Sequence, residues 1–425
     1  MKKFWFLFYN GFIIPPLYIA VRAAGLFNNK VKKGIKGRKR IFEELILNSS
    51  STNKLNKLIW FHSSSLGEFE QAKPIIEELK KTKGINILVT FFSPSGYDNS
   101  RKYPFADMVS YLPFDTKSNA DRFINIVKPD AAVIMRYDIW PNHIWSMKNF
   151  NIPTFLVDAT MKANSKRKYP FVKNFHKYLF RNISSILTVS QADSDGFKEF
   201  GCTDNQVKAV GDTRFDRVYQ RSLVARSHNL IREDLFKGKK ILVAGSSWES
   251  DEEVILSAFS KLAEQDKDVI LIIAPHEPTV IHLEKIENEF SGDLETIRFS
   301  FLNDYKNERV IIIDSIGILL TLYTYADVAY IGGGFKQNIH NVLEAAVYGI
   351  PVVFGPKYDN SQEAKELLEL GGGIEIRNKK EAYRNFRALF NDEKLRKELG
   401  TISFNYVQKN LGATEKILQE IKKTL

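Results

Sequence analysis

The sequence of 425 residues contains one cysteine, Cys202, and this scarcity excludes several kinds of protein. One thiol cannot form an internal disulfide, and it cannot alone supply the ligands of a zinc finger or an iron–sulfur cluster. Cys202 lies in a turn-like Gly-Cys-Thr-Asp stretch without a neighbouring histidine, which argues against a catalytic thiol. The seven histidines include neither an HExxH nor an HxH pair, so we expect no metal and no other cofactor. A reducing compartment is the expected location.

Several enzyme signatures are also missing. The sequence has no GxSxG elbow, which disfavours a Ser–His–Asp hydrolase, and neither a Walker A sequence nor a GxGxxG fingerprint. Hydrophobic residues make up 44% of the chain and charged residues 26%, which excludes disorder throughout. At about 100–200 residues per domain, the length predicts two or three domains.

The amino terminus is apolar. Phe4 to Val21 has 18 residues without a formal charge, barely enough to cross a bilayer core, and it is interrupted by Asn10, Gly11 and the Pro15-Pro16 pair. Prolines break or kink helices, so one membrane span and two short interfacial segments are both open. A cleaved signal peptide is a third alternative, although Arg22 makes a poor cleavage site. We expect a membrane-associated segment at residues 1–27.

Much of the excess positive charge lies beside this apolar segment. The chain has 61 Lys+Arg and 50 Asp+Glu, hence 61 − 50 = +11. Many cations come directly after the segment: Arg22, Lys30, Lys32, Lys33, Lys36, Arg38, Lys39 and Arg40. Such residues stay on the cytoplasmic side, so the catalytic body should face the cytoplasm. They can form a solvated surface, but beside an apolar anchor attraction to anionic inner-membrane lipid is the favoured interpretation.

The remaining chain alternates short apolar runs with amphipathic stretches, such as those at Glu68–Lys81 and Asn119–Lys128. Expected strands cover 58–61, 85–92, 108–114, 131–135, 154–159 and 185–190, and after a polar stretch 241–246, 269–275, 309–314, 328–334 and 351–356. This alternation predicts an α/β protein with two doubly wound, Rossmann-like domains facing an inter-domain cleft. We place the domains at 28–220 and 221–425. A final helix, roughly Asn405–Leu425, could pack on either of them.

A glycine-rich loop suggests a phosphate site in the second domain. Ile331 leads into Gly332, Gly333 and Gly334, and a helix is expected to start near Asn341. Glycines let a backbone approach a ligand closely, and the N–H groups at a helix start favour phosphate. Glu344, on the same helical face as Asn341, can accept ribose hydroxyl groups. The glycines can alternatively serve only a tight turn. A second small-residue loop, with Ser246 and Ser247, faces the same cleft.

Two acidic residues follow strands of the first domain. Glu68 ends the loop His62-Ser63-Ser64-Ser65-Leu66-Gly67-Glu68, and it can act as a general base toward an acceptor hydroxyl or stabilise a helix start. Asp138, in Tyr137-Asp138-Ile139-Trp140-Pro141-Asn142, can orient a substrate or cap a turn. The residues alone leave these alternatives open.

The order of motifs resembles that of the Kdo transferases, a family of two-domain GT-B glycosyltransferases. The segments are FHSSSLGE (61–68), YDIWPN (137–142), VGDTRFD (210–216), GSS (245–247), APHEP (274–278), DSIGIL (314–319), ADVAYIGGG (326–334), HNVLEAAVYGIPVVFGP (340–356) and GGG (371–373). The resemblance covers nearly the whole chain. It implies inverting transfer of 3-deoxy-D-manno-oct-2-ulosonic acid (Kdo) from CMP-Kdo to a lipid A precursor in lipopolysaccharide core biosynthesis, without a required metal.

The resemblance also implies roles for individual residues. Glu68 matches the family's general base, Asp138 an acidic residue of its Glu-Leu-Trp-Pro-Asn motif, and Arg214 a position that is usually Lys. The first domain would bind the acceptor and the second the CMP-sugar. Implied donor contacts are Ser246, Ser247, Pro275, His276, Ile316, Gly317, Ile318, Gly333, Gly334, Asn341, Val342, Leu343 and Glu344.

The sequence departs from the family in places. Asp138 is shorter than the usual Glu, Ile318 replaces an acidic residue, Gly334 a Ser and His276 an Arg. Physical chemistry agrees with the resemblance, because helix-start N–H groups and Arg214 can stabilise a leaving phosphate without a divalent cation.

Two alternatives remain. Another GT-B glycosyltransferase or a UDP-sugar epimerase would share the architecture. A membrane-tethered nucleic-acid-binding protein would share the basic arm, but the sequence has no recognised RNA-binding signature, so no nucleic-acid partner is expected.

Overall fold

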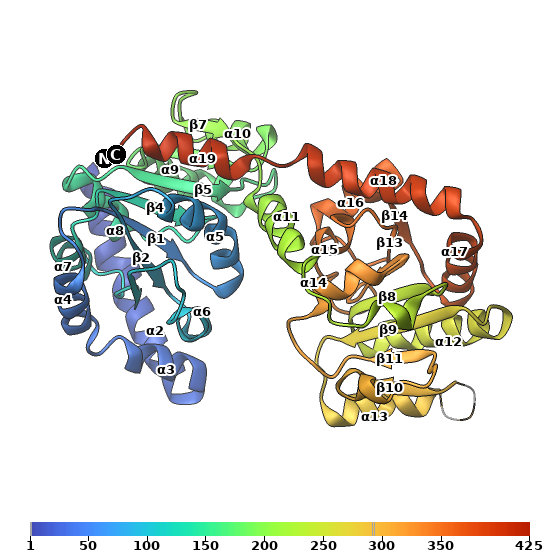
Figure 1. The fold of residues 1–425 in the computed structure, drawn as a ribbon. Coiled ribbons are helices and arrows are strands. Elements are labelled where there is room, and N and C mark those ends of the chain that lie inside the picture. Colours follow the sequence, from blue (N-terminus) through green and yellow to red (C-terminus); the bar gives the residue numbers. More distant parts are fainter. Residues whose placement is uncertain (1, 291, 293) are drawn as a thin grey trace. The chain divides into compact units, whose positions relative to one another are not determined.

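The computed structural model describes residues 2–290, 292 and 294–425, and in this part of the chain it has two parallel seven-stranded sheets (Figure 1). The chain divides into two compact units, one running up to Arg217 and including Leu411–Leu425, the other Val218–Asn410. The division falls inside a helix, Thr213–Ala225. The predicted α/β fold class, with two Rossmann-like sheets, is confirmed.

The first unit has strand order β3-β2-β1-β4-β5-β6-β7. The strands are β1 (Lys57–Ser63), β2 (Ile85–Phe91), β3 (Met108–Tyr111), β4 (Ala131–Met135), β5 (Thr154–Ala159), β6 (Ser185–Thr188) and β7 (Val207–Ala209). The α-helices are α1 (Lys2–Phe8), α2 (Ile14–Phe27), α3 (Asn29–Gly37), α4 (Ile41–Ser51), α5 (Leu66–Lys80), α6 (Pro94–Ser100), α7 (Lys117–Val127), α8 (Pro141–Asn149), α9 (Pro170–Phe180), α10 (Gln191–Lys198), α11 (Thr213–Ala225) and α19 (Ala413–Lys422).

The second unit has strand order β10-β11-β9-β8-β12-β13-β14. The strands are β8 (Lys240–Ser247), β9 (Val269–Pro275), β10 (Thr296–Arg298), β11 (Val310–Ile312), β12 (Val328–Ile331), β13 (Val352–Phe354) and β14 (Gly373–Glu375). The α-helices are α12 (Glu249–Gln265), α13 (Val280–Glu289), α14 (Leu319–Leu322), α15 (Leu343–Ala346), α16 (Gln362–Leu370), α17 (Lys379–Asn391) and α18 (Glu393–Lys409).

Short 3₁₀ helices supplement both units, at Lys166–Lys168, Glu233–Phe236, Phe299–Asp304 and Tyr323–Tyr325.

The strands are apolar on both faces because helices cover both faces of the sheet. In β1, Trp60 belongs to one buried cluster, whereas Ile59 and Phe61 belong to another that includes α5 and α19. Side chains alternate across a strand, so a near-continuous apolar run is what two covered faces require. The carboxyl ends of the strands are therefore left as the open edge.

Each sheet has a switch point beside its first strand, where the chain crosses to the other half of the sheet. In the first unit this point lies between β1 and β4, which pair in parallel, and in the second between β8 and β12. In open parallel sheets, ligands bind beyond the carboxyl ends of the strands at this switch point. The loops after these four strands are consequently the expected places for a ligand site.

The amino-terminal helices form a nearly continuous helical stretch. A π-helical turn, Tyr9–Ile13, joins α1 to α2, and Pro15-Pro16 fall in the first turn of α2, where prolines are tolerated. Lys3–Phe27 is long and apolar enough to cross a membrane by length and composition. The prolines therefore do not interrupt the helical stretch, and its irregularity is the π-turn that precedes them.

The prediction of one carboxyl-terminal helix at Asn405–Leu425 is wrong. The structure has two helices, α18 and α19, separated at Gly412, whose φ of +100° favours glycine. α18 belongs to the second unit and α19 to the first.

Candidate active site

Glu68 lies in the first turn of α5, beyond the carboxyl end of β1. Its side chain is 8% exposed, and its Oε2 accepts hydrogen bonds from the N–H (2.6 Å) and the hydroxyl (2.8 Å) of Ser64. The hydroxyl of Ser65 caps the helix by accepting the N–H of Glu68. Within the described part of the chain, Oε1 accepts no hydrogen bond. One oxygen fixes the carboxylate, and the other is available to a substrate hydroxyl.

Asp138 follows β4 and is held by a relay of buried side chains. Its Oδ2 lies 2.8 Å from Nε2 of His62, and Nδ1 of His62 lies 2.9 Å from the hydroxyl of Thr90. That hydroxyl accepts the indole N–H of Trp60 at 2.8 Å. Nδ1 of His62 also lies 3.1 Å from the carbonyl oxygen of Thr90. A carboxylate oxygen can only accept, so Nε2 of His62 donates its proton to Asp138. The relay fixes the orientation of Asp138 and of the His62 ring.

Arg214 is positioned by acidic residues near the start of α11. Asp212 accepts its Nε and Nη2 at 2.8 and 2.6 Å. Next to this pair, the fully buried Asp158 accepts hydrogen bonds from the N–H and hydroxyl of Thr213. Burial, and secondarily the charge of Asp212, raise the pKa of Asp158 to about 7. The guanidinium of Arg214 is 35% exposed, so it combines a fixed orientation with contact to solvent.

The glycine loop after β12 is packed tightly. The N–H of Gly333 donates to Oδ2 of Asp251 at 2.8 Å, and a Cβ on Gly334 would lie 2.6 Å from the backbone nitrogen of Gly355. A Cβ on Gly332 would lie 2.1 Å from the carbonyl oxygen of Ser246. These glycines thus serve close backbone packing, and Asp251 occupies the N–H of Gly333 that a phosphate would need.

Ser246 and Ser247 lie at the end of β8. Ser246 has a φ of +55°, and the hydroxyl of Ser247 donates to Oε1 of Glu252 at 2.7 Å. Oε2 of Glu252 lies 2.8 Å from Nε2 of His282. Burial alone would lower the pKa of His282, but the hydrogen bond and charge of Glu252 raise it above its usual value. Hydrogen bonds through Ser247, Glu252 and His282 thus connect the end of β8 with α13.

Three aromatic rings pack together beside this loop. His276, which follows Pro275 at the end of β9, stacks on both Trp248 (centroid distance 4.7 Å) and His340 (4.4 Å). The indole N–H of Trp248 donates to Nε2 of His340 at 3.1 Å. Burial and the neighbouring His276 lower the pKa of His340 to about 4. At neutral pH His340 is therefore uncharged, with its other ring nitrogen protonated.

The other predicted donor residues lie in loops of the second unit. Ile316 is 85% exposed in the loop after β11, Gly317 has a φ of +92°, and Ile318 precedes α14. Asn341 accepts the N–H of Leu343 on its Oδ1, next to the buried Val342.

Glu344 lies in α15, which is only four residues long. Its Oε1 is 3.4 Å from Nη1 of Arg221 on α11. Arg221 is a residue that sequence reasoning missed, because no local signal connects positions so far apart.

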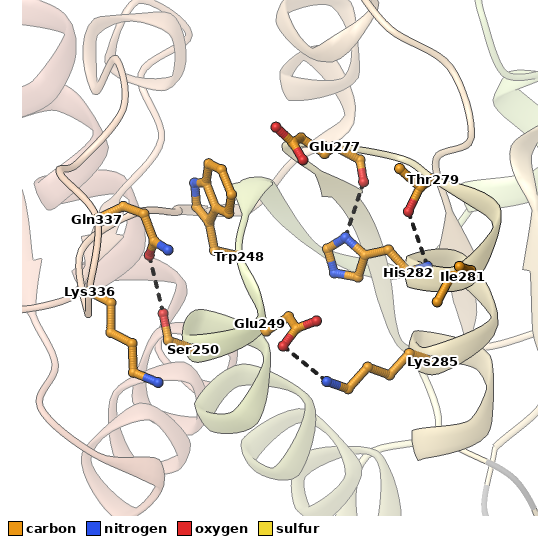
Figure 2. Close-up of a pocket in the computed structure, with 10 residues that line it drawn as sticks. All are labelled: Trp248, Glu249, Ser250, Glu277, Thr279, Ile281, His282, Lys285, Lys336 and Gln337. Carbon is orange, nitrogen blue, oxygen red and sulfur yellow. Dashed lines mark hydrogen bonds and ion pairs between the residues drawn. The ribbon is translucent and has the colours of Figure 1, made fainter.

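A cavity of about 360 Å³ opens beside the aromatic stack (Figure 2). Lys285 of α13 reaches the carboxylate of Glu249 at 3.0 Å on one side, and Lys336 lies on the other. Glu277 is also part of the wall, so the lining combines both signs of charge.

The described residues contain no group of three or more His, Cys, Asp or Glu that could hold a metal ion. Cys202 is buried, and burial raises the pKa of its thiol to about 11, so the thiol stays protonated at neutral pH.

Comparisons with known proteins show which family the chain resembles. A sequence model of the family described as 3-deoxy-D-manno-octulosonic-acid transferase (kdotransferase) matches residues 38–217. A 3-deoxy-D-manno-octulosonic acid transferase of Haemophilus influenzae is 27% identical, over 98% of each chain. One of Aquifex aeolicus is 31% identical over 76% of this chain and 83% of the relative.

Among solved structures, UDP-GlcNAc 2-epimerase from Neisseria meningitidis bound to UDP-GlcNAc superposes with a TM-score of 0.60. It covers 86% of this chain and all of the epimerase, at 15% sequence identity. A likeness at that identity establishes the two-domain fold alone.

Proposed function

This chain belongs to the 3-deoxy-D-manno-octulosonic acid (Kdo) transferase family, and we propose that it moves Kdo from CMP-Kdo to a phosphorylated lipid A precursor with inversion. The chain is a glycosyltransferase of lipopolysaccharide biosynthesis. The observation that carries the acceptor side of the proposal is Glu68, a nearly buried carboxylate with one oxygen fixed by Ser64.

In the proposed reaction Glu68 is the general base. Oε1 takes the proton from a hydroxyl of the acceptor as the oxygen of that hydroxyl attacks the anomeric carbon of Kdo. The bond from this carbon to the phosphate oxygen breaks, and CMP leaves with the bonding electrons. The helix start and the two bonds from Ser64 keep the carboxylate in place without blocking Oε1.

We assign supporting roles to Asp138 and Arg214. Asp138, oriented by His62, lies at the same strand switch point as Glu68 and is suited to hold an acceptor hydroxyl. Arg214, oriented by Asp212, is assigned to the developing charge of the leaving phosphate.

We assign CMP to the β8–β12 switch point of the second unit. Near it lie Ser247 at the end of β8, His276 after β9 and Glu344 in α15, and the carboxylate of Glu344 is suited to the ribose hydroxyl groups. Because Glu344 is paired with Arg221, CMP binding would exchange or extend this pairing. The N–H of Gly333 is not assigned to the phosphate, since it is bonded to Asp251.

The amino-terminal helices support a membrane location. One side of the stretch from α1 to α2 contacts the rest of the first unit, where Tyr9 donates to Asp115 at 2.8 Å and Trp5 contacts Phe171 and Phe175. The other side exposes a series of apolar residues: Phe4, Leu7, Phe12, Ile19, Leu26 and Phe27. A helical segment whose Trp5, Tyr9 and Tyr18 contact the folded unit is better suited to lie in the membrane interface than to cross it. We propose this arrangement on the cytoplasmic face of the inner membrane, since cations come directly after the segment.

A donor panel tests the proposed function. The protein is incubated with a lipid A precursor in mixed micelles and either CMP-Kdo or UDP-sugars, and nucleotide release is measured. CMP release that depends on the lipid is the expected result. Turnover of a UDP-sugar without the lipid would instead indicate an epimerase.

A further inference from the structure

We propose that a cavity between the amino-terminal helices and the ends of β2 and β3 binds one acyl chain of the lipid acceptor, with an acceptor phosphate at its cationic rim. We call it the α2–α4 cavity. This inference rests on the proposed function, because it names the part of the acceptor that the first unit holds.

The cavity has the size and lining of a site for an apolar ligand. Its volume is about 500 Å³, within the range of about 300–1,000 Å³ typical of ligand sites. α2, α3 and α4 contribute Val21, Val31 and Phe42, and the loops after β2 and β3 contribute Phe92 and Phe114. Each methylene of a chain transferred from water into such a lining gains about fourfold in affinity.

The charges that line the cavity have one sign. Arg22, Lys30, Arg38 and Lys39 are part of the wall, and among the described residues that line it none is acidic. The cavity beside the aromatic stack differs in this respect, because Glu249 and Glu277 line it. A ligand with an apolar chain and an anionic group complements the α2–α4 cavity.

Arg38 is the most informative of these cations. Its Nε, Nη1 and Nη2 donate to the carbonyl oxygens of Leu112, Gly34 and Phe92, at 2.8, 2.9 and 2.6 Å. No carboxylate of the described residues forms an ion pair with it. Burial lowers its pKa to about 10, so it stays charged at neutral pH. A largely enclosed charge without a counter-ion is costly, and an acceptor phosphate would supply one.

The wall of the cavity adjoins the loop that holds the proposed base. The backbone N–H of Ser93, a lining residue, donates to the carbonyl oxygen of Ser64 at 3.0 Å. Ser64 in turn holds the carboxylate of Glu68 through its N–H and hydroxyl. The neighbouring Phe92 stacks on Trp140, at a centroid distance of 4.8 Å, in the loop that carries Asp138. An acyl chain in the cavity would thus anchor the acceptor close to the reacting groups.

The cavity is also next to the apolar surface assigned to the membrane. α2 and α3 pack against each other as a hairpin, and the tip of the hairpin exposes Leu26 (79%) and Phe27 (92%). A lipid can therefore enter from the membrane without carrying its chain through water.

Filling the cavity is the first test. Val31→Trp places a large ring in the cavity, and Leu47→Trp, on the exposed face of α4 outside the lining, is the matched control. KM is measured for phosphorylated glucosamine disaccharides with short, medium and long acyl chains. For the wild type and the control, KM should fall about fourfold per methylene until the cavity is full. In Val31→Trp this gain should end at shorter chains. The same dependence on chain length in all three proteins would overturn the proposal.

Changing the rim is the second test. Lys30→Glu and Lys39→Glu together should raise KM for the phosphorylated acceptor at least tenfold but not for the dephosphorylated analogue, with Lys54→Glu as control. A photoactivatable group at the acyl terminus should label residues 18–42 and 92–119. Labelling of other residues would contradict the proposal. Competition by phosphatidylglycerol vesicles that is as strong as that of the acceptor itself would also contradict it.

The test is separable from that of the proposed function. Equilibrium binding of the same labelled lipids without donor reports the cavity even if no acceptor supports CMP release. If no transfer is seen but lipid binding depends on chain length and Val31→Trp abolishes that dependence, the proposed function is rejected and the proposed cavity site is kept. If transfer is seen but Val31→Trp leaves lipid binding unchanged, the proposed cavity site is rejected and the function is kept.

Discussion

At the residue scale, replacing Glu68 by glutamine removes a proton acceptor and retains the side-chain shape. The amide oxygen of Glu68→Gln can still accept the bonds from Ser64. We expect transfer to fall about 10²-fold or more, the scale of a general base, while CMP affinity is unchanged. Glu78→Gln, at a half-buried position of the same helix that pairs with Lys81, is the control. Near-normal turnover by Glu68→Gln would reduce Glu68 to a helix-start residue.

A second residue-scale prediction concerns Asp158, whose pKa burial raises from 3.8 to about 7. The folded state therefore binds this proton more tightly than the unfolded state does. The resulting stabilisation is complete below about pH 3.8 and is lost as the pH rises through about 7. Asp158→Asn is uncharged throughout, so its free energy of unfolding, relative to wild type, should improve from pH 5 to pH 8. Urea unfolding at both pH values measures this, and parallel wild-type and variant profiles would contradict it.

Glu344→Ala tests the donor side at the residue scale. Hydrogen bonds to charged groups contribute about 1.5–3 kcal/mol, so CMP affinity should fall roughly tenfold or more while acceptor KM barely changes. Calorimetry with CMP and initial rates at saturating lipid provide the measurement, with the exposed Glu369→Ala as control. Unchanged CMP affinity together with a raised acceptor KM would place the nucleotide elsewhere.

The sequence predicts which residues lie at strand ends but not which side chains meet. Glu68 and Asp138 follow apolar runs, so their places beyond β1 and β4 could be foreseen. The contact of Asp138 with His62 could not, because it depends on the pairing of β1 with β4. The hydrogen bond from the N–H of Gly333 to Asp251 could not be predicted either. The simplest interpretation of a glycine loop is that its N–H groups are open to phosphate, and this N–H is not.

Elements that depend on their neighbours are the hardest to predict. The strands that the sequence does not indicate, β7, β10 and β14, are each three residues long and lie at the edge of a sheet. Their runs are too short for a periodic signal, and pairing with a longer strand creates them.

At the element scale, membrane binding by the amino-terminal helices can be tested by changes that leave the folding of the first unit intact. Removing residues 1–27 would also uncover the apolar partners of Trp5 and break the bond from Tyr9 to Asp115. Serine at Phe12, Ile19, Leu26 and Phe27 leaves those contacts intact, because each of these side chains is at least 67% exposed. We expect this variant to keep its unfolding profile and to pellet less with anionic vesicles.

Serine at Ala23 and Ala24, small residues on the exposed part of α2, is the matched control for that variant. Undiminished pelleting of the fourfold variant, after washing with high salt, would reveal a second apolar contact surface.

At the scale of the whole molecule, the strand–helix alternation is sufficient to predict two parallel α/β sheets. It does not predict that the chain returns to the first unit after Asn410, because an amphipathic helix can pack on any complementary face. In the structure, α19 packs on α5, and Asp216 accepts the N–H groups of Gly412 (2.7 Å) and Thr414 (2.6 Å). The end of the chain thus supports the helix that carries Glu68.

This support yields a prediction about how the two units share the reaction. Ile417 of α19 is fully buried in a cluster with Ile76 and Leu79 of α5. Ile417→Ala should destabilise the first unit by about 2–5 kcal/mol, the usual cost of such a truncation, whereas the exposed Lys416→Ala should have little effect. Transfer should be lost at a lower temperature in Ile417→Ala. CMP affinity should stay normal, since the residues proposed to bind CMP lie within Val218–Asn410 and Arg214 is assigned to the charge that develops on the phosphate during the reaction. Calorimetric titration with CMP and thermal inactivation of transfer, measured on the same preparations, provide the test. If CMP affinity declined together with transfer, the nucleotide site would depend on the first unit, and the assignment of donor binding to the second unit alone would be wrong.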